Sequence, residues 1–239
     1  MSTVEIVDRS EMVDTLKSRL RIAPSTTAIV AVDMHRGHLD PAIATMPATP
    51  EDCASVIKHT KNLLDFARGA GIPVIHVILI QRNIPGLGAE GLNLKFWKAL
   101  HEIANAENRL TPGRKSTAAD HNLVGSPGTE IIPELLHPSD HVINNKKRLD
   151  CFYGTDLEIL LRVLKTETVV LTGINTNTCV LNTAFTACNR DFQVVVISDC
   201  VASMYGRDLH VLGLENVKRC LGYVLTVEEF KNKIRGAQG

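Results

Sequence analysis

The sequence has no excess of charge of either sign. Its 26 Lys and Arg residues equal its 26 Asp and Glu residues, so the formal net charge is zero. It also has no block of basic residues that could neutralise a row of phosphates or bind an anionic membrane surface. Neither a nucleic acid nor a membrane is therefore expected as a partner of this chain.

Long apolar runs and targeting signals are missing as well. No run approaches the roughly 20 apolar residues that span a bilayer. The first 20 residues contain four acidic side chains (Glu5, Asp8, Glu11 and Asp14), which fits neither a signal peptide nor a transit peptide. We therefore expect a cytoplasmic protein.

The six cysteines show no paired spacing. They form no CxxC pair and no metal-finger pattern, and they occupy positions 53, 151, 179, 188, 200 and 220. Disulfides are typical of oxidising compartments, and the chain carries no secretory signal. We therefore expect free thiols, most of them buried and inert.

What the sequence does contain suits one α/β domain over residues 1–239. Hydrophobic residues make up 44% and charged residues 22%, as in ordinary globular proteins. Continuous apolar runs alternate with helical patterns, which favours a parallel sheet covered on both faces. We expect a three-layer α/β/α doubly wound sheet of about six strands. The expected strands are 28–33, 73–80, 141–144, 169–172, 193–198 and 223–225, and the expected helices are 51–71, 155–164 (with Thr155 as N-cap), 178–190, 208–221 and 227–234.

The regular alternation is interrupted between residues 81 and 127. This stretch is rich in Gly and Pro and has one helical pattern near residues 94–107. Long interruptions inside compact domains are often lids or binding loops, and we expect a variable loop of that kind here. A formal GxGxxG at 86–91 follows the second strand instead of the first, so it predicts a flexible loop and not a dinucleotide site.

Polar side chains follow three of the expected strands. Asp33 ends the first strand, Lys146 and Lys147 follow the third, and Cys179 follows the fourth through a polar turn. In parallel sheets, ligands bind outside the carboxyl ends of the strands. A thiol at the start of a helix is exposed to the helix dipole and to free N–H groups, which favour thiolate and can hold an oxyanion. These residues predict a nucleophile, a proton-transfer group and an electrostatic partner.

Three segments carry a resemblance to a known family. AIVAVDMHRGHLD (28–40), NKKRLDCFYGTDLE (145–158) and VVLTGINTNTCVLNTAFTA (169–187) resemble the isochorismatase-like cysteine hydrolases, in this order and at this spacing. That family includes N-carbamoylsarcosine amidohydrolase, biuret hydrolase, ureidoacrylate amidohydrolase and the nicotinamidases. The resemblance covers about residues 25–235, and it implies the strand order 3-2-1-4-5-6 and a homo-oligomer, either a dimer or a tetramer.

The resemblance also implies roles for individual residues. Asp33 is the general base, Lys146 the triad lysine and Cys179 the nucleophile. Lys146 is preferred to Lys147 because the family's lysine lies six residues before a Phe, here Phe152. A cis peptide bond is implied between Ile174 and Asn175, with the backbone N–H groups of Asn175 and Cys179 as the oxyanion hole.

The sequence departs from the family pattern in places. His35 replaces the Gln that many members carry two residues after the aspartate, and Cys151 replaces a small residue. The nicotinamidases have an Asp-Trp-His metal site after the second strand, where this chain reads QRNIPGLG. We therefore expect no metal, no other cofactor and no activity on nicotinamide.

Four residues are candidates for substrate binding. His35 and Arg36 follow the first strand, Arg82 follows the second, and Phe152 lies in the lysine segment. The guanidinium of Arg82 could bind a carboxylate or carbonyl with two hydrogen bonds, with Arg36 or Arg148 as alternatives.

The sequence as a whole predicts an amidohydrolase that cleaves a C–N bond of a small ureido or amide compound through a cysteine thioester. Two alternatives stay open. A vinyl-ether hydrolase of the isochorismatase type would not need the thiol, and a small-molecule-binding or redox-sensing protein would bind without turnover. The substrate itself cannot be read from the sequence.

Overall fold

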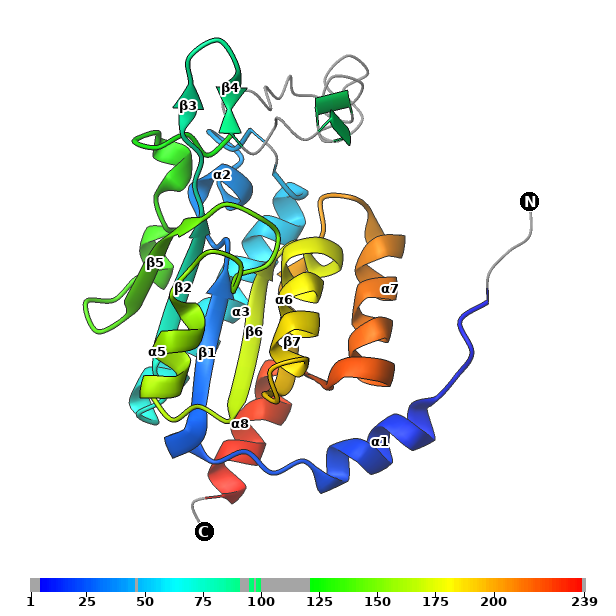
Figure 1. The fold of residues 1–239 in the computed structure, drawn as a ribbon. Helices are drawn as coiled ribbons and strands as arrows, with labels where there is room; N and C mark the ends of the chain where they lie inside the picture. The colour runs from blue at the N-terminus through cyan, green and yellow to red at the C-terminus, as the bar shows by residue number, and fades with distance from the viewer. Residues whose placement is uncertain (1–4, 46, 91–94, 97, 100–120, 238–239) are drawn as a thin grey trace.

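The fold is built on one six-stranded sheet (Figure 1). The computed structural model describes residues 5–45, 47–90, 95–96, 98–99 and 121–237. All five strand pairings in the sheet are parallel, in the order β5-β2-β1-β6-β7-β8. By position along the chain this is the order 3-2-1-4-5-6, which confirms the expected fold. The strands are β1 (Thr27–Val32), β2 (Val74–Leu79), β5 (His141–Lys146), β6 (Thr168–Ile174), β7 (Gln193–Ala202) and β8 (Tyr223–Leu225).

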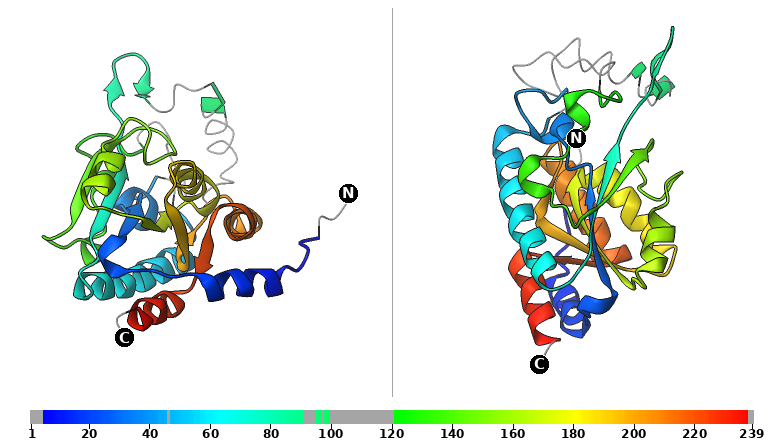
Figure 2. Two further views of the ribbon diagram at one scale, coloured as in Figure 1. Left: turned by 60° about the horizontal axis from the view of Figure 1, so that its bottom comes forward. Right: turned by 90° about the vertical axis from the view of Figure 1, so that its left-hand side faces the viewer.

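Helices cover both faces of the sheet and give the expected three layers (Figure 2). One hydrophobic cluster packs α3 and α8 against one face, and a second packs α5, α6 and the end of α7 against the other. Because both faces are covered, every residue of β1 and β6 is buried. The helices are α1 (Ser10–Arg19), α2 (Arg36–Leu39), α3 (Pro50–Gly69), α5 (Leu157–Val163), α6 (Leu181–Cys188), α7 (Arg207–Asn216) and α8 (Val227–Gly236).

Capping side chains define where α3 and α8, the two helices of one layer, begin. Thr49 accepts a hydrogen bond from the N–H of Asp52, and Pro50 takes the first helical position of α3. At α8, Thr226 and Glu229 form a capping box with each other's backbone N–H groups. These caps bind N–H groups that have no partner inside the helix, so each helix begins at the residue its sequence indicates.

Single-turn elements and one hairpin complete the described chain. β3 and β4 pair as an antiparallel hairpin in the GxGxxG segment, with Gly86 and Gly88 at positive φ. The sequence analysis expected only a loop there. The remaining elements are η1 (Pro24–Thr26), β3 (Asn83–Ile84), β4 (Gly88–Ala89), η4 (Pro127–Thr129), η5 (Pro133–Leu135), η6 (Thr176–Val180) and η7 (Val217–Leu221).

Several expectations about helices need correction. Helices α1 and α2 were not expected, and the helix expected at 178–190 begins with the π-helical turn η6. Asp156, and not Thr155, is the N-cap of α5, although the Thr155 hydroxyl accepts a hydrogen bond from the N–H of Leu157. Of the helix expected near 94–107, residues 95–96 and 98–99 are described and are helical; its remaining residues, and most of the loop expected at 81–127, lie outside the described residues.

Two further expectations concern the chain as a whole. All six cysteines are free, as expected. Within the part of the chain that the structure describes, no helix combines the length and apolar character needed to cross a bilayer.

Candidate active site

The site lies where three strands of the sheet end, β1, β5 and β6. Asp33 directly follows β1, Lys146 is the last residue of β5, and Cys179 lies in η6 just after β6. Because β1 lies between β2 and β6, and β5 pairs with β2, these ends meet at one edge of the sheet. An irregular register between β2 and β5 occurs at this edge, beside Lys146.

The three side chains are in direct contact. The Nζ of Lys146 donates to Oδ2 of Asp33 at 2.5 Å and to Sγ of Cys179 at 3.4 Å. Asp33 and Lys146 have no exposed area, and Cys179 is 3% exposed. A buried carboxylate and ammonium this close are both charged, since each offsets the desolvation cost of the other.

The backbone around Asp33 fixes its carboxylate in place. Asp33 has φ of 53°, its N–H donates to the carbonyl of Val77, and its Oδ1 accepts from the N–H of Leu79 at 2.8 Å. A left-handed non-glycine residue is uncommon, and Asp is one of the few types that adopts it readily. Strand β2 thus binds one carboxylate oxygen and leaves the other for Lys146.

Glycine allows β6 to reach this edge. Gly173 has φ of 116°, and a Cβ built there would lie 1.9 Å from the carbonyl oxygen of Val32. Any larger residue would therefore push β6 away from β1, and with it the turn that carries Cys179.

Hydrogen bonds of Asn175 stabilise the turn between β6 and Cys179. The peptide bond between Ile174 and Asn175 is cis, as the resemblance implied. The Asn175 carbonyl accepts from the N–H groups of Thr178 and Val180, and its side-chain oxygen accepts from the N–H of Met204 at 2.9 Å. The loop after β7 therefore fixes the segment whose N–H groups are the candidates for an oxyanion hole.

Burial keeps the resting thiol protonated. Burial first, and then the charge of Asp33 and the hydrogen bond to it, raise the pKa of Cys179 to about 12, although Lys146 acts in the opposite direction. Burial alone would lower the pKa of Lys146, but the charges of Asp33 and Cys179 raise it above its ordinary value. Burial therefore acts against the thiolate that the sequence analysis expected at the helix start.

The isochorismatase domain model matches residues 27–229, most of the chain. The chain belongs to the isochorismatase family. Ureidoacrylate amidohydrolase RutB from Methylobacterium radiotolerans is 27% identical over 90% of this chain and 82% of its own length. Maleamate amidohydrolase from Pseudomonas putida is 23% identical over 89% and 88%. The protein is thus a hydrolase of a family whose curated relatives include amidohydrolases.

Solved structures of family members have the same fold. A cysteine hydrolase from Pseudomonas syringae pv. phaseolicola superposes with a TM-score of 0.74 at 23% identity, covering 92% of this chain and 97% of that one. N-carbamoylsarcosine amidase from Thermoplasma acidophilum superposes with a TM-score of 0.62 at 25% identity, covering 85% and 97%.

The Nζ of Lys147 has other partners than Asp33 and Cys179. It donates to the carbonyl of Ile80 at 2.8 Å and pairs with Glu90 at 2.9 Å. Of the two neighbouring lysines, Lys146 is therefore the one that contacts Asp33 and Cys179.

The two arginine candidates are engaged with carboxylates. Arg82 is 70% exposed in its side chain and donates to Glu90 at 2.7 Å. Arg36 pairs with Asp40 and with Glu130. Either guanidinium could bind a substrate only by sharing or exchanging these partners.

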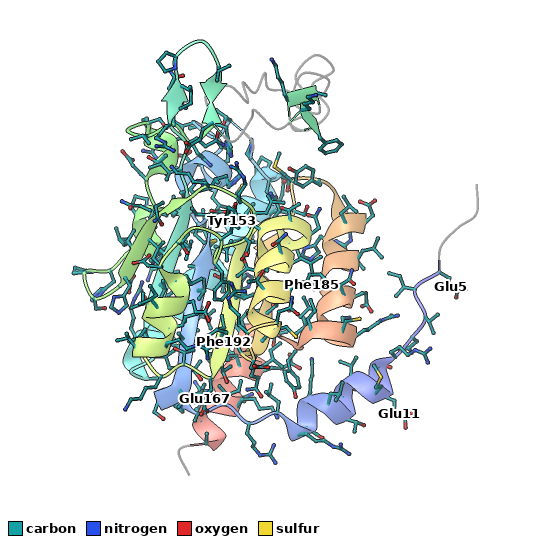
Figure 3. The ribbon with its side chains drawn as sticks, in the orientation of Figure 1. Glu5, Glu11, Tyr153, Glu167, Phe185 and Phe192 are labelled. Atoms are coloured by element: carbon teal, nitrogen blue, oxygen red, sulfur yellow. The ribbon has the colours of Figure 1, made fainter. Side chains whose placement is uncertain are left out.

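Phe152 lies in the hydrophobic core. Its ring stacks on Phe192 with centroids 6.1 Å apart. Phe192, which is labelled in Figure 3, directly precedes β7 and belongs to the same hydrophobic cluster as Phe152. The described packing therefore places Phe152 in the core, and its contact with substrate stays a prediction.

His35 belongs to a buried polar cluster beside the triad. Its ring stacks on His38 at 4.9 Å, and His38 lies 4.8 Å from His121. The Asn122 amide nitrogen lies 3.3 Å from Nε2 of His35 and 2.9 Å from Nε2 of His121. The described residues contain no group of three or more His, Cys, Asp or Glu with the geometry of a metal site.

The sequence analysis did not identify Tyr205. It follows β7, and its N–H donates to the hydroxyl of Ser203, which donates in turn to the side chain of Asn177 at 2.6 Å. Burial, and then the charge of Cys179, raise the pKa of the Tyr205 phenol above its usual range. Its position after a strand end was the one available signal, but a lone tyrosine in a loop carries no motif.

Proposed function

We propose that this chain is an amidohydrolase that cleaves a C–N bond of a small ureido or amide compound through a cysteine thioester. The observation that carries the proposal is the buried contact of Lys146 with both Asp33 and Cys179 at the carboxyl edge of the sheet. The similarity to ureidoacrylate amidohydrolases over most of the chain supports the same chemistry.

The first half-reaction acylates the thiol. Asp33 accepts the Sγ proton as sulfur attacks the substrate carbonyl carbon, and the carbonyl electron pair moves onto oxygen. The backbone N–H groups of Asn175 and Cys179 bind this oxyanion. The C–N bond then breaks, and Asp33 gives its proton to the leaving nitrogen, so ammonia or an amine departs.

The second half-reaction restores the enzyme. Asp33 takes a proton from a water molecule as that water attacks the thioester carbonyl, and the C–S bond breaks as the tetrahedral intermediate collapses. The sulfur recovers the proton from Asp33. Lys146 stays protonated throughout and stabilises whichever of Asp33 and Cys179 carries the negative charge, which matches its raised pKa.

Other features of the proposed enzyme stay predictions of the sequence. These are the substrate contacts of His35, Arg36, Arg82 and Phe152, the absence of a metal, a cytoplasmic location, a single domain with a binding loop at 81–127, and assembly into a dimer or tetramer.

The proposal is tested with a panel of ureido acids, biuret-like compounds and simple amides, read by ammonia release. At least one class should be turned over, and mass spectrometry of a quenched reaction should show an acyl adduct on Cys179. Cys179→Ala should abolish turnover, whereas Cys188→Ala, a half-buried thiol at the end of α6, should retain it.

The same experiment separates the alternatives. A vinyl-ether hydrolase would keep its activity in Cys179→Ala. A sensor would bind compounds without releasing ammonia. Full amide hydrolysis by the Ala variant would contradict the thioester mechanism.

A further inference from the structure

The loop that follows β7 is bound to the turn that carries Cys179. The N–H of Met204 donates to the side-chain oxygen of Asn175 at 2.9 Å, and the hydroxyl of Ser203 donates to the side-chain oxygen of Asn177 at 2.6 Å. Both asparagines precede Cys179 in the turn after β6. In Figure 1 the connection from β7 to α7 passes beside the start of α6. The loop therefore has a fixed position relative to the nucleophile.

The backbone of Tyr205, the next residue of this loop, is restrained on both sides. Its N–H donates to the Ser203 hydroxyl at 3.1 Å. Gly206, which follows it, is the N-cap of α7 and has φ of 116°, a conformation that other residue types rarely adopt. Tyr205 is therefore held in place before a substrate arrives, which lowers the entropy cost of any contact that its side chain makes.

The phenol of Tyr205 interacts with the nucleophile, but the described protein does not use its hydroxyl. Burial, and then the charge of Cys179, raise the pKa of this phenol above its usual range. No group among the described residues forms a hydrogen bond with the phenol oxygen. Buried tyrosine hydroxyls usually have a hydrogen-bond partner. A substrate bound at Cys179 can supply that partner.

Exposure distinguishes Tyr205 from the three residues of the triad. Asp33, Lys146 and Cys179 are buried, whereas Tyr205 is half-buried. Tyr205 is therefore accessible to a molecule that comes from solvent, and its phenol is also close enough to Cys179 to interact with the charge of the thiolate. A side chain with both properties is well placed to contact the part of a substrate that is not attacked.

The surroundings of the phenol favour an uncharged ligand group. Among the described residues, only Cys179 acts on the pKa of Tyr205 through its charge, so no described cation lies beside the phenol. The ammonium of Lys146 already binds Asp33 and Cys179. A carboxylate buried beside the phenol would lack a cation as partner, whereas a carbonyl oxygen needs only the hydrogen bond that a protonated phenol donates.

We propose that Tyr205 is a substrate-binding residue whose hydroxyl donates a hydrogen bond to an uncharged carbonyl oxygen of the substrate, other than the one that Cys179 attacks. The attacked carbonyl oxygen binds to the N–H groups of the oxyanion hole, so the phenol needs a second acceptor. Among ureido and amide compounds, this selects those with a second neutral carbonyl near the cleaved C–N bond. The inference rests on the proposed amidohydrolase function.

Tyr205→Phe tests the inference, because it removes the hydroxyl and keeps the ring. Two compounds differ only in the second carbonyl: N-acetylurea contains it, and N-ethylurea has a methylene group in its place. The variant should lower kcat/KM for N-acetylurea by about 5- to 100-fold, mainly through KM, and should change that for N-ethylurea by less than about twofold. A compound that is not hydrolysed is measured as a competitive inhibitor of the best substrate, with the same fold-changes expected in its inhibition constant.

Tyr223→Phe is the matched control. Tyr223 is a half-buried tyrosine that begins β8, so it lies at the opposite edge of the parallel sheet from Cys179. This variant should keep the wild-type kinetics with both compounds, and circular dichroism should show that both variants fold. Unchanged kinetics of Tyr205→Phe, or an equal loss with both compounds, would overturn the inference, because an equal loss indicates a structural role.

A third compound tests the charge of the group that Tyr205 binds. N-carbamoylglycine carries a carboxylate, and Tyr205→Phe should affect it less than N-acetylurea. A larger effect on N-carbamoylglycine would overturn the assignment to a neutral carbonyl. The proposed function fails separately: if the wild type releases ammonia from no ureido or amide compound, both proposals are wrong, whereas turnover that Tyr205→Phe leaves unchanged overturns only the role of Tyr205.

Discussion

At the scale of single residues, the protonation state of Cys179 governs how the site reacts with reagents. With a pKa raised to about 12, the thiol holds its proton at neutral pH, and in the proposed mechanism Asp33 removes that proton during attack. Lys146 contacts both Asp33 and Cys179, so the charges of these three residues are coupled. Removing the charge of one residue changes the pKa values of the others.

Alkylation of Cys179 should therefore depend steeply on pH. Iodoacetamide reacts with thiolate, so the rate at Cys179 should rise about tenfold for each pH unit between 7 and 9.5, without reaching a plateau. The measurement is mass spectrometry of the Cys179 peptide over time, with substrate-free enzyme. A rate that is already maximal at pH 7 would show a resting thiolate and contradict the burial argument.

Variants of Lys146 should distinguish its contribution to the free energy of unfolding from its contribution to activity. Lys146→Met leaves the Asp33 carboxylate buried without its cation and should lower the free energy of unfolding by about 3–5 kcal/mol. Asp33→Asn/Lys146→Met removes both charges, and Asn still accepts the N–H of Leu79 and tolerates a positive φ. The double variant should therefore regain most of the stability in urea unfolding, although both variants are inactive. If it is no more stable than Lys146→Met, the pair is not coupled as the structure indicates.

At the scale of elements, the position of Lys146 depends on how the edge strand β5 is anchored. Asp140 immediately precedes β5 and accepts hydrogen bonds from Arg68 of α3, from His76 of β2 and from the N–H of His137. Burial alone would raise the pKa of Asp140, but these hydrogen bonds lower that pKa well below its usual range. The carboxylate thus joins a helix, a neighbouring strand and a loop at the start of β5.

Asp140→Asn should destabilise the protein by about 1.5–3 kcal/mol at pH 7, since charge-assisted hydrogen bonds are lost. Because the pKa of Asp140 is lower in the folded chain than in the unfolded chain, its carboxylate stabilises the fold when the pH is above the unfolded pKa, near 3.8. This stabilisation is lost as the pH falls below that value. The difference between the variant and the wild type in urea unfolding should therefore shrink below about pH 4. Asp65→Asn, which removes an exposed carboxylate from the same arginine, is the control and should change stability by no more than about 1 kcal/mol. An equal effect of both substitutions would show that Asp140 is not a specific anchor.

At the scale of the whole molecule, the buried histidine cluster makes global stability sensitive to acid. Burial first, and then the charges of His38, His121 and Lys146, lower the pKa of His35 well below 6.5. Below pH 6.5 the unfolded chain binds a proton at this residue and the folded chain does not. Stability therefore falls as the pH falls, by up to about 1.4 kcal/mol per pH unit for this one residue.

His35→Gln, which introduces the residue common in the resembling family, should reduce this slope between pH 7 and 5. The amide oxygen can still accept a hydrogen bond from Asn122. Urea midpoints at three pH values measure the slope, and His59→Gln, on the outer side of α3, serves as the control. A slope that is unchanged in His35→Gln but reduced in the control would place the acid sensitivity elsewhere.

The sequence by itself determined the features that depend on neighbours along the chain. Continuous apolar runs predicted the buried strands, Pro50 and Gly71 indicated the bounds of α3, and three segments around Asp33, Lys146 and Cys179 predicted the family. Strand order followed from the resemblance to the family. These features could be read because periodicity and capping are local properties of the backbone.

Only the tertiary structure decided what depends on residues far apart in the sequence. Burial raised the pKa of Cys179, Glu90 engaged both Arg82 and Lys147, and the loop after β7 brought Tyr205 close enough to Cys179 to interact with its charge. The physical reason is that desolvation, ion pairing and packing are set by distance in space, which the order of residues does not specify.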